Sequence, residues 1–230
     1  MKDSNSIYDD KDLQRLYNEN YFSDRSRPPM WQRRAEFIQE KFNPKTALDV
    51  GCAYGELVKS LNELGVEAYG IDGSDYAISK APFSIKDKLF KVNLNSDQFP
   101  FDDKKFDFVG SFYSVEHIHN IEFFGKELFR TLKDNGVAWF LTPNVGEEGR
   151  SEVDVFTNTF KEWKKIFEKQ NFIVSKFSPH EMMALRGRLK KFRFYTLPNC
   201  MQNVVKRVAY DYANKKMKDT SFLVVKKING

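Results

Sequence analysis

The sequence Leu48-Asp49-Val50-Gly51-Cys52-Ala53-Tyr54-Gly55 decides the fold of this 230-residue chain. Residues 46–50 predict a short strand, and the turn that follows contains two glycines that would let the backbone approach a ligand. From residue 55 to 64 the apolar residues recur at helical spacing. A strand that enters a glycine turn and then a helix is typical of the ligand crevice at the carboxyl edge of an open α/β sheet.

Strands and helices alternate on both sides of this turn. Strands are predicted at 46–50, 67–71, 89–94, 106–111, 137–141, 172–177 and 221–226. Helices are predicted at 31–42, at 55–64, from Ser74 onward, at 121–132 with a stop at Asn135-Gly136, and at 157–169. This alternation predicts a doubly wound α/β domain, with a mostly parallel seven-stranded sheet that is covered by helices on both faces.

Asp72 ends the second predicted strand, 23 residues after Asp49. A carboxylate at this place can accept hydrogen bonds from both hydroxyl groups of a ribose. A tight turn followed by an acid that caps a helix is the alternative, but both features at this spacing favour a nucleotide ligand. A nicotinamide dinucleotide is disfavoured, because residues 51–56 lack the Gly-x-Gly-x-x-Gly spacing.

Six segments, in this order, resemble motifs of the class I S-adenosylmethionine-dependent methyltransferases. They are residues 48–55, Gly70-Ile71-Asp72-Gly73-Ser74, Asn93-Leu94-Asn95 with Phe99-Pro100-Phe101, Phe106-Asp107-Phe108-Val109, Val115-Glu116-His117-Ile118, and Leu132-Lys133-Asp134-Asn135-Gly136 with Thr142-Pro143-Asn144. The resemblance covers residues 45–177 and the final strand. It implies a Rossmann-like fold and methyl transfer from S-adenosylmethionine to an oxygen or nitrogen of a small acceptor. A catalytically inactive binding or scaffold protein with this fold is the alternative, and the intact motif residues favour the enzyme.

The resemblance also implies a role for individual residues. Asp49, Gly51 and the turn through Gly55 would hold the methionine part of the cofactor, Asp72 its ribose, and Asn93 and the backbone of Leu94 its adenine. The complete expected cofactor site is Asp49, Gly51, Ala53, Gly55, Asp72, Gly73, Asn93, Leu94 and Phe112. Ala53 stands where the family has glycine, and its methyl group disfavours a positive φ. Asn93 stands where aspartate is commoner, but its amide oxygen can still accept a hydrogen bond from the adenine amine.

His117 is the candidate catalytic base, because it follows the fourth strand at the crevice and titrates near neutral pH. Alternatively, Glu116-His117 starts or caps the next helix. Some similar enzymes place a metal near such a pair, with a further acid three residues before the glutamate. This chain has Tyr113 there, so no metal is expected, and Tyr113 would instead line the methyl pocket, where its ring favours a cationic sulfonium.

The first 42 residues are expected to form a lid and helix that cover the cofactor. Tyr17 and Tyr21 lie in a tyrosine-rich segment that resembles the lid of many such enzymes, and we expect both to bind substrate. The alternative is an aromatic staple that holds the N-terminus to the core.

The basic residues are concentrated in one segment. The chain has 37 Lys and Arg against 32 Asp and Glu, a net charge of +5. Residues 178–219 alone contain ten Lys or Arg and three acids, so the rest of the chain is slightly acidic. We expect a single domain, residues 1–230, with a cofactor-binding core at 43–177 and 220–230. Residues 178–219 would be a basic insertion on the acceptor side, or in the plainest interpretation a solvated pair of basic helices.

The insertion indicates the class of acceptor. Basic and aromatic residues interleave in it, and Arg186 and Arg188 are expected to bind the acceptor. This pattern suits a small anionic or sugar-bearing molecule, which we expect, and also RNA or peripheral contact with an anionic membrane surface.

Composition excludes several other classes. Hydrophobic residues make up 41% of the chain and aromatics 15%, which excludes a disordered protein. Cys52 and Cys200 form no Cys-x-x-Cys pair, so neither a disulfide scaffold nor a zinc ribbon is supported. The polar N-terminus shows no secretory signal, and the longest apolar run, 137–141, is too short for a transmembrane segment. A cytoplasmic location is therefore expected.

Overall fold

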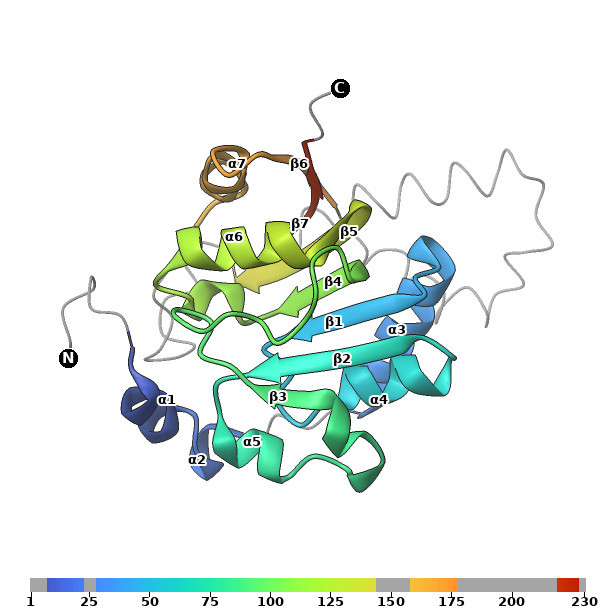
Figure 1. Ribbon diagram of the computed structural model, residues 1–230, viewed down its shortest axis with the longest axis vertical. Coiled ribbons are helices and arrows are strands. Elements are labelled where there is room, and N and C mark those ends of the chain that lie inside the picture. Colours follow the sequence, from blue (N-terminus) through green and yellow to red (C-terminus); the bar gives the residue numbers. More distant parts are fainter. Residues whose placement is uncertain (1–7, 23–27, 144–157, 178–218, 228–230) are drawn as a thin grey trace.

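The computed structural model of the protein describes residues 8–22, 28–143, 158–177 and 219–227. Seven strands form one sheet in the order β3-β2-β1-β4-β5-β7-β6 (Figure 1). They are β1 (Thr46–Val50), β2 (Glu67–Asp72), β3 (Leu89–Lys91), β4 (Phe106–Phe112), β5 (Leu132–Pro143), β6 (Phe172–Lys176) and β7 (Asp219–Lys226). Strands β1 to β5 pair in parallel, and β7 is antiparallel to both of its neighbours. The predicted mostly parallel seven-stranded sheet is confirmed.

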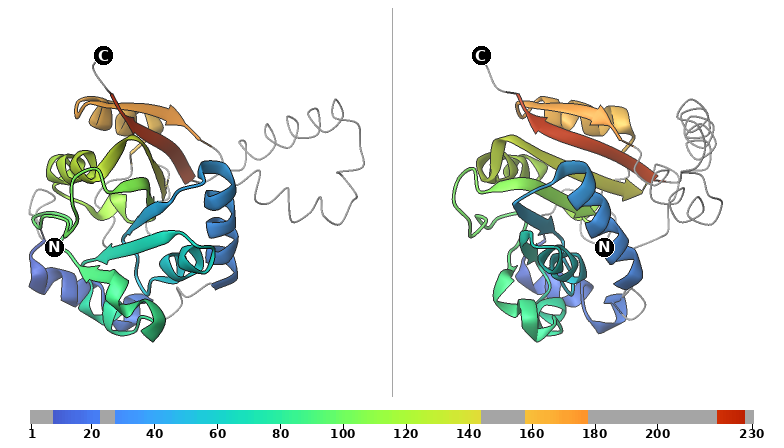
Figure 2. Two further views of the ribbon diagram at one scale, coloured as in Figure 1. Left: turned by 45° about the vertical axis from the view of Figure 1, so that its right-hand side comes forward. Right: turned by 90° about the vertical axis from the view of Figure 1, so that its right-hand side faces the viewer.

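Helices cover both faces of this sheet (Figures 1 and 2). The described helices are α1 (Asp10–Leu16), α2 (Glu19–Phe22), α3 (Pro28–Phe42), α4 (Glu56–Glu63), α5 (Asp75–Ser79), α6 (Ile121–Thr131) and α7 (Phe160–Glu168), with short 3-10 helices η1 (Phe83–Lys88) and η2 (Val115–His117). Apolar residues of α3 and α4 pack in one buried cluster, and those of α6 and α7 pack in a second. Among the described helices, none is long and apolar enough to cross a bilayer.

The alternation of side chains along β1 decides where Asp49 points. Leu48 and Val50 pack in the cluster of α6 and α7, and Ala47 packs in the cluster of α3 and α4. Successive side chains of a strand point to opposite faces, so Asp49 shares the face of Ala47. The carboxyl group of Asp49 is therefore directed to the side of the sheet that α3 covers.

The third strand is shorter than predicted, because local hydrogen bonds end it. The backbone N–H of Asn93 donates to the Asp97 carboxylate at 2.9 Å, and the N–H of Asn95 donates to Asn93 Oδ1 at 3.1 Å. Such short polar side chains offer the backbone an alternative to the sheet ladder. Strand β3 ends at Lys91 and a turn follows.

The helix predicted at 121–132 is confirmed as α6, but the predicted stop at Asn135-Gly136 is wrong. Helix α6 ends at Thr131, and Leu132 already pairs with Phe106 of β4. The next pair in the ladder joins Phe108 to Val137, so Asn135 and Gly136 lie in an irregularity within β5. Pairing with β4 overrides the local turn signal here. The last strand also begins earlier than predicted, at Asp219.

Candidate functional site

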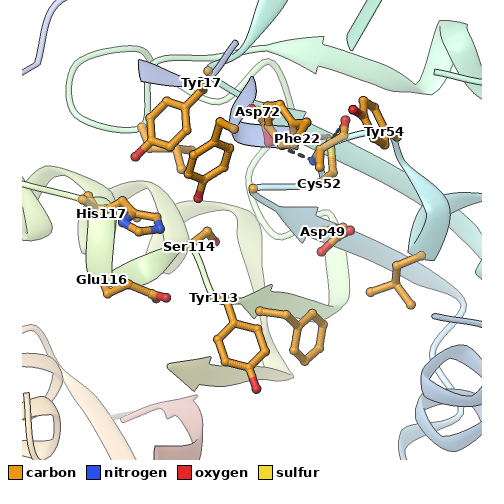
Figure 3. A pocket seen from close by; sticks show the side chains of 18 of the residues that line it. Tyr17, Phe22, Asp49, Cys52, Tyr54, Asp72, Tyr113, Ser114, Glu116 and His117 are labelled. Atoms are coloured by element: carbon orange, nitrogen blue, oxygen red, sulfur yellow. Dashed lines mark hydrogen bonds between the residues drawn. The ribbon is translucent and has the colours of Figure 1, made fainter. Parts of the chain in front are cut away.

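A cavity of about 580 Å³ opens at the carboxyl ends of β1, β2 and β4 (Figure 3). Its lining combines the N-terminal helices, the glycine turn after β1 and the loop after β4. Eleven residues singled out from the sequence line it: Tyr17, Tyr21, Asp49, Gly51, Ala53, Asp72, Gly73, Leu94, Phe112, Tyr113 and His117. Thus one cavity brings together residues, such as Tyr17 and His117, that lie 100 positions apart in the chain.

Gly51 lines the cavity as expected, and both glycines of the turn also make room for side chains of the protein. Gly51 has φ 74°, and a Cβ added to it would lie 2.4 Å from Ser114 Cβ. Gly55 has φ 75°, and its Cβ would lie 2.6 Å from Ile85 Cδ1. Gly55 does not line the cavity at all. Both positions need glycine for the left-handed backbone and for close packing.

Ala53 adopts the positive φ that its side chain disfavours. Its φ is 49°, a conformation that costs an L-residue about 1–2 kcal/mol. The backbone N–H of Ala53 donates to Asp72 Oδ2 at 2.8 Å. This hydrogen bond to a carboxylate offsets part of the strain and ties the turn to the end of β2.

Asp72 retains acceptor capacity that faces the cavity. Its Oδ2 accepts from Ala53, and its Oδ1 accepts from the backbone N–H of Ser74 at 2.8 Å. Burial raises the pKa of Asp72, while hydrogen bonds from the backbone of Ser74, Ala53 and Gly73 lower it. The two carboxylate oxygens have four lone pairs together, so the group can accept at least one more hydrogen bond. This arrangement suits a ligand hydroxyl group.

Asp49 lies beside Arg34, a residue that the sequence analysis missed. Both are almost completely buried, at 4% and 1% exposure. Burial raises the pKa of Asp49 to about 7, although the nearby positive charge of Arg34 lowers it. Burial likewise lowers the pKa of Arg34 to about 10. Arg34 lies four residues before Ile38, on the apolar stripe of the predicted helix, and this position was the signal that could have revealed it.

The guanidinium group of Arg34 lies between aromatic rings that border the cavity. Its central carbon is 4.3 Å from the ring centre of Phe112 and 4.7 Å from that of Trp31. Its Nε and Nη1 have no hydrogen-bond partner within the described part of the chain. Phe112 and Trp31 both line the cavity, so a buried cation lies directly behind its aromatic wall.

The opposite side of the cavity holds tyrosines and the Glu116-His117 pair (Figure 3). The rings of Tyr17 and His117 have centroids 5.9 Å apart, and Tyr17 contacts Tyr21 edge-on at 4.9 Å. Glu116 is 1% exposed. Glu116 and His117 belong to η2, whereas the side chain of Asn120 caps α6. The pair therefore neither starts nor caps that helix.

Tyr113 connects the cavity to the start of β7. Its backbone has φ 60°, and its hydroxyl donates to Asp219 Oδ2 at 2.7 Å. Burial raises the pKa of Tyr113, and so does the charge of Asp219. Asp219 also pairs in register with Pro143, which lines the cavity. The chain thus re-enters the sheet after residues 178–218 at the edge of the cavity.

Asn93 does not line the cavity, contrary to the expectation that its side chain faces a ligand. Its Oδ1 accepts hydrogen bonds from the backbone N–H of Asn95 at 3.1 Å and from Asn95 Nδ2 at 3.2 Å. Its Nδ2 donates to the carbonyl oxygen of Tyr8 at 3.2 Å. The amide of Asn93 is occupied in shaping the turn, and Asn95 lines the cavity instead.

The charges that line the cavity are all of one sign within the described residues. Four carboxylates line it, those of Asp49, Glu56, Asp72 and Glu116, and no Lys or Arg from the described ranges does. Only two of these acids, Asp49 and Asp72, were predicted from the sequence as site residues. Arg186 and Arg188, predicted to bind the acceptor, lie outside the described residues. Among the described residues, no group of three His, Cys, Asp or Glu could hold a metal ion.

The remaining lining residues were not assigned to the site from the sequence. They are Leu13, Phe22, Met30, Trp31, Cys52, Tyr54, Glu56, Leu57, Asn95, Ser114, Glu116, Ile118 and Pro143. Most are apolar or aromatic, and their types match those of ordinary core residues. Six of them lie inside the motifs quoted above, namely Cys52, Tyr54, Asn95, Glu116, Ile118 and Pro143. The other seven belong to no such motif, so only the folded structure identifies them.

Comparisons with curated sequences give partial matches. A ubiquinone biosynthesis O-methyltransferase of Pelagibacter ubique is 37% identical over 99 residues, which are 42% of this chain and 41% of that protein. An uncharacterized protein of Methanocaldococcus jannaschii is 29% identical over 161 residues, 69% of this chain and 61% of that protein. The chain therefore spans less than two thirds of the length of these curated relatives.

Solved structures share the fold at low sequence identity. A SAM-dependent methyltransferase from Archaeoglobus fulgidus has a TM-score of 0.62 and 15% identity, over 90% of this chain and 98% of that one. An O-methyltransferase from a polyketide synthase of Brevibacillus brevis, in complex with S-adenosyl-L-homocysteine, has a TM-score of 0.56 and 18% identity, over 85% and 71%. A protein-family profile described as a methyltransferase domain matches residues 21–190. With most of its length matched by that profile, and with the sheet order and motif positions described above, this chain belongs to the methyltransferase domain family.

Proposed function

We propose that this protein is an enzyme that transfers a methyl group from S-adenosylmethionine to an oxygen or nitrogen of a small acceptor. The observation that carries the proposal is Asp72, which lines the cavity at the end of β2 and is anchored to the glycine turn by the backbone N–H of Ala53. Family membership and the cavity at the carboxyl edge of the sheet support the same function.

The residues of the cavity fit this cofactor. Asp72 would accept hydrogen bonds from the ribose hydroxyls, and Gly73 and Leu94 also line the cavity. Asp49 is an acid suited to the methionine ammonium group. When bound, the cofactor supplies an electrophilic methyl group on a cationic sulfonium. The tyrosines and Phe112 offer aromatic faces to such a cation.

Residues 178–219 are proposed to complete the acceptor side. The hydrogen bond from Tyr113 to Asp219 places the end of this segment at the cavity edge. The described lining contains no Lys or Arg, so Arg186 and Arg188 would have to contact any anionic or sugar-linked part of the acceptor. The first helices, with Tyr17 and Tyr21, would cover the cofactor and contact the acceptor.

The function is tested in two steps. Calorimetry should show that the purified protein binds S-adenosylhomocysteine, and no binding at millimolar concentration would exclude the proposed function. The protein is then incubated with methyl-labelled cofactor and a fractionated cell extract. The mass of the labelled product identifies the acceptor, and it distinguishes a sugar-linked molecule, a lipid and an RNA. A protein that binds cofactor but labels no fraction would be a scaffold.

Cofactor binding is expected to weaken as the pH falls below 7. The pKa of Asp49 is raised to about 7 by burial, so its carboxyl group binds a proton at lower pH in the free protein. A ligand ammonium interacts with the ionised form, so binding below pH 7 must release this proton. The dissociation constant then rises by up to about tenfold per pH unit. Calorimetry in buffers of different ionisation enthalpy measures the release. An Asp49→Asn protein that releases the same number of protons would assign the release to another group.

His117 is proposed as the base that accepts the proton of the acceptor. Its imidazole lines the cavity beside Tyr17. Replacement by alanine is expected to lower the rate of methyl transfer about 100-fold or more. It should also abolish the fall in rate at low pH that protonation of His117 would cause. The rate is measured with the labelled extract fraction, and affinity for S-adenosylhomocysteine is the control. A normal rate with an unchanged pH profile would make His117 a structural residue.

A further inference from the structure

We propose that the group methylated in this cavity is an amine, which Glu116 binds in its ammonium form. This inference rests on the proposed methyltransferase function and narrows its acceptor to one chemical class. It starts from the charge of the cavity, where the described lining has four carboxylates and no Lys or Arg. Two of these acids, Asp49 and Asp72, are proposed above to bind the cofactor, and a third, Glu56, lies in the first turn of α4, next to the glycine turn.

Glu116 is the acid on the acceptor side. It belongs to η2, which follows β4, and its side chain is buried, with 1% of its surface exposed. Figure 3 shows its carboxylate directed to the space between His117 and Tyr113. Burial is the main cause of the raised pKa of both Tyr17 and Tyr113, and the negative charge of Glu116 adds to it. A carboxylate surrounded by these aromatic rings is a site for a cation.

Tyr17 adds a polar group to this side of the cavity. Its hydroxyl is buried and has no hydrogen-bond partner within the described residues. Its ring contacts those of Tyr21 and His117. An ammonium group has three donors, which can be shared between the Glu116 carboxylate and the Tyr17 hydroxyl oxygen. This ammonium group would then lie close to His117, which lines the same side of the cavity.

The redistribution of charge during the reaction favours an amine over a hydroxyl group. The ammonium gives one proton to His117, and the neutral nitrogen attacks the methyl carbon with its lone pair. As the carbon–nitrogen bond forms, the carbon–sulfur bond breaks and its electrons stay on sulfur. Positive charge thus moves from sulfur to nitrogen and remains among the carboxylates. A hydroxyl group would also give its proton to His117, but it bears no charge before the reaction and its ether product bears none afterwards, so it would gain no ionic interaction with the carboxylate of Glu116.

A matched pair of bisubstrate ligands tests this without knowledge of the natural acceptor. In both, a nitrogen replaces the cofactor sulfur. In one this nitrogen bears an aminopropyl arm, and in the other a hydroxypropyl arm of the same length. Calorimetry is expected to show that the wild-type protein binds the aminopropyl ligand about tenfold more tightly or better. In Glu116→Gln this preference should fall to about twofold or less, with affinity for S-adenosylhomocysteine retained.

Glu122→Gln is the matched control. It removes the same charge from an exposed position on α6 that does not line the cavity, so it should keep the full preference. Equal or tighter binding of the hydroxypropyl ligand by the wild-type protein would overturn the amine assignment. This comparison needs no variant and therefore does not depend on whether Glu116→Gln folds. A preference that survives in a folded Glu116→Gln protein would overturn the role of Glu116. Failure to bind S-adenosylhomocysteine would instead overturn the proposed function itself.

Discussion

Asp72→Ala is expected to weaken binding of S-adenosylhomocysteine by about 1–3 kcal/mol, or roughly 5- to 150-fold, the scale of hydrogen bonds to a charged group. The substitution removes the acceptors proposed for the ribose hydroxyls. It also removes the hydrogen bonds that Asp72 accepts from Ala53 and Ser74, so the strained turn at Ala53 loses its anchor. Isothermal calorimetry on the purified protein measures the effect.

Asp75→Ala is the matched control for this prediction. Asp75 lies three residues further along, in the first turn of α5, where its exposed carboxylate pairs with Lys91. It does not line the cavity, so the affinity should stay within about twofold of wild type, as for a surface ion pair. An unchanged affinity in Asp72→Ala would remove Asp72 from the cofactor site and leave it as a turn residue.

Gly51→Ala is expected to lower the free energy of unfolding by about 2–5 kcal/mol. The positive φ of 74° accounts for about 1–2 kcal/mol of this loss, because a side chain disfavours the left-handed region. Overpacking accounts for the rest, because the new Cβ would lie 2.4 Å from Ser114 Cβ. Ser114 has little freedom to move, since its hydroxyl donates to the Val50 carbonyl at 2.7 Å. Chemical denaturation measures the change.

Gly65→Ala separates the two contributions. Gly65 has φ 83°, and a Cβ added there would meet nothing within 4 Å. This control should therefore show only the conformational cost of about 1–2 kcal/mol. Equal losses in the two variants would show that the contact with Ser114 contributes nothing, and that the protein tolerates a side chain at position 51 by local movement.

The strands of the sheet were predictable because their patterns are local. Residues 46–50 and the glycine turn indicated β1 and the start of α4, and both are confirmed. Two predictions failed, one because a distant strand competes with a local signal and one because polar side chains form local hydrogen bonds. Asn135-Gly136 is a turn signal, but the chain around it pairs with β4 and lies within β5. The early end of β3 depends on side-chain hydrogen bonds among Asn93, Asn95 and Asp97, which the apolar pattern does not record.

The candidate site was predictable where motif residues themselves line the cavity. Asp49, Asp72 and His117 are brought together as the sequence analysis expected, although their roles remain proposals. Asn93 shows the opposite case, because its neighbour Asn95 occupies the cavity wall in its place. Motif spacing places a residue at the right loop, but it cannot tell which of two neighbouring side chains turns inward.

The sequence by itself determined the order of strands and helices, the glycine turn and the acid at the end of β2, since these depend on residues close together in the chain. Only the tertiary structure decided which charged side chains lie in or behind the cavity wall. Arg34 is one of two adjacent arginines in the sequence, and folding buries it behind Phe112 near Asp49. Glu116 is one acid among 32 in the chain, and folding buries it in the cavity wall near Tyr17. Burial and proximity set these charges, and both arise from contacts between segments that are distant in sequence.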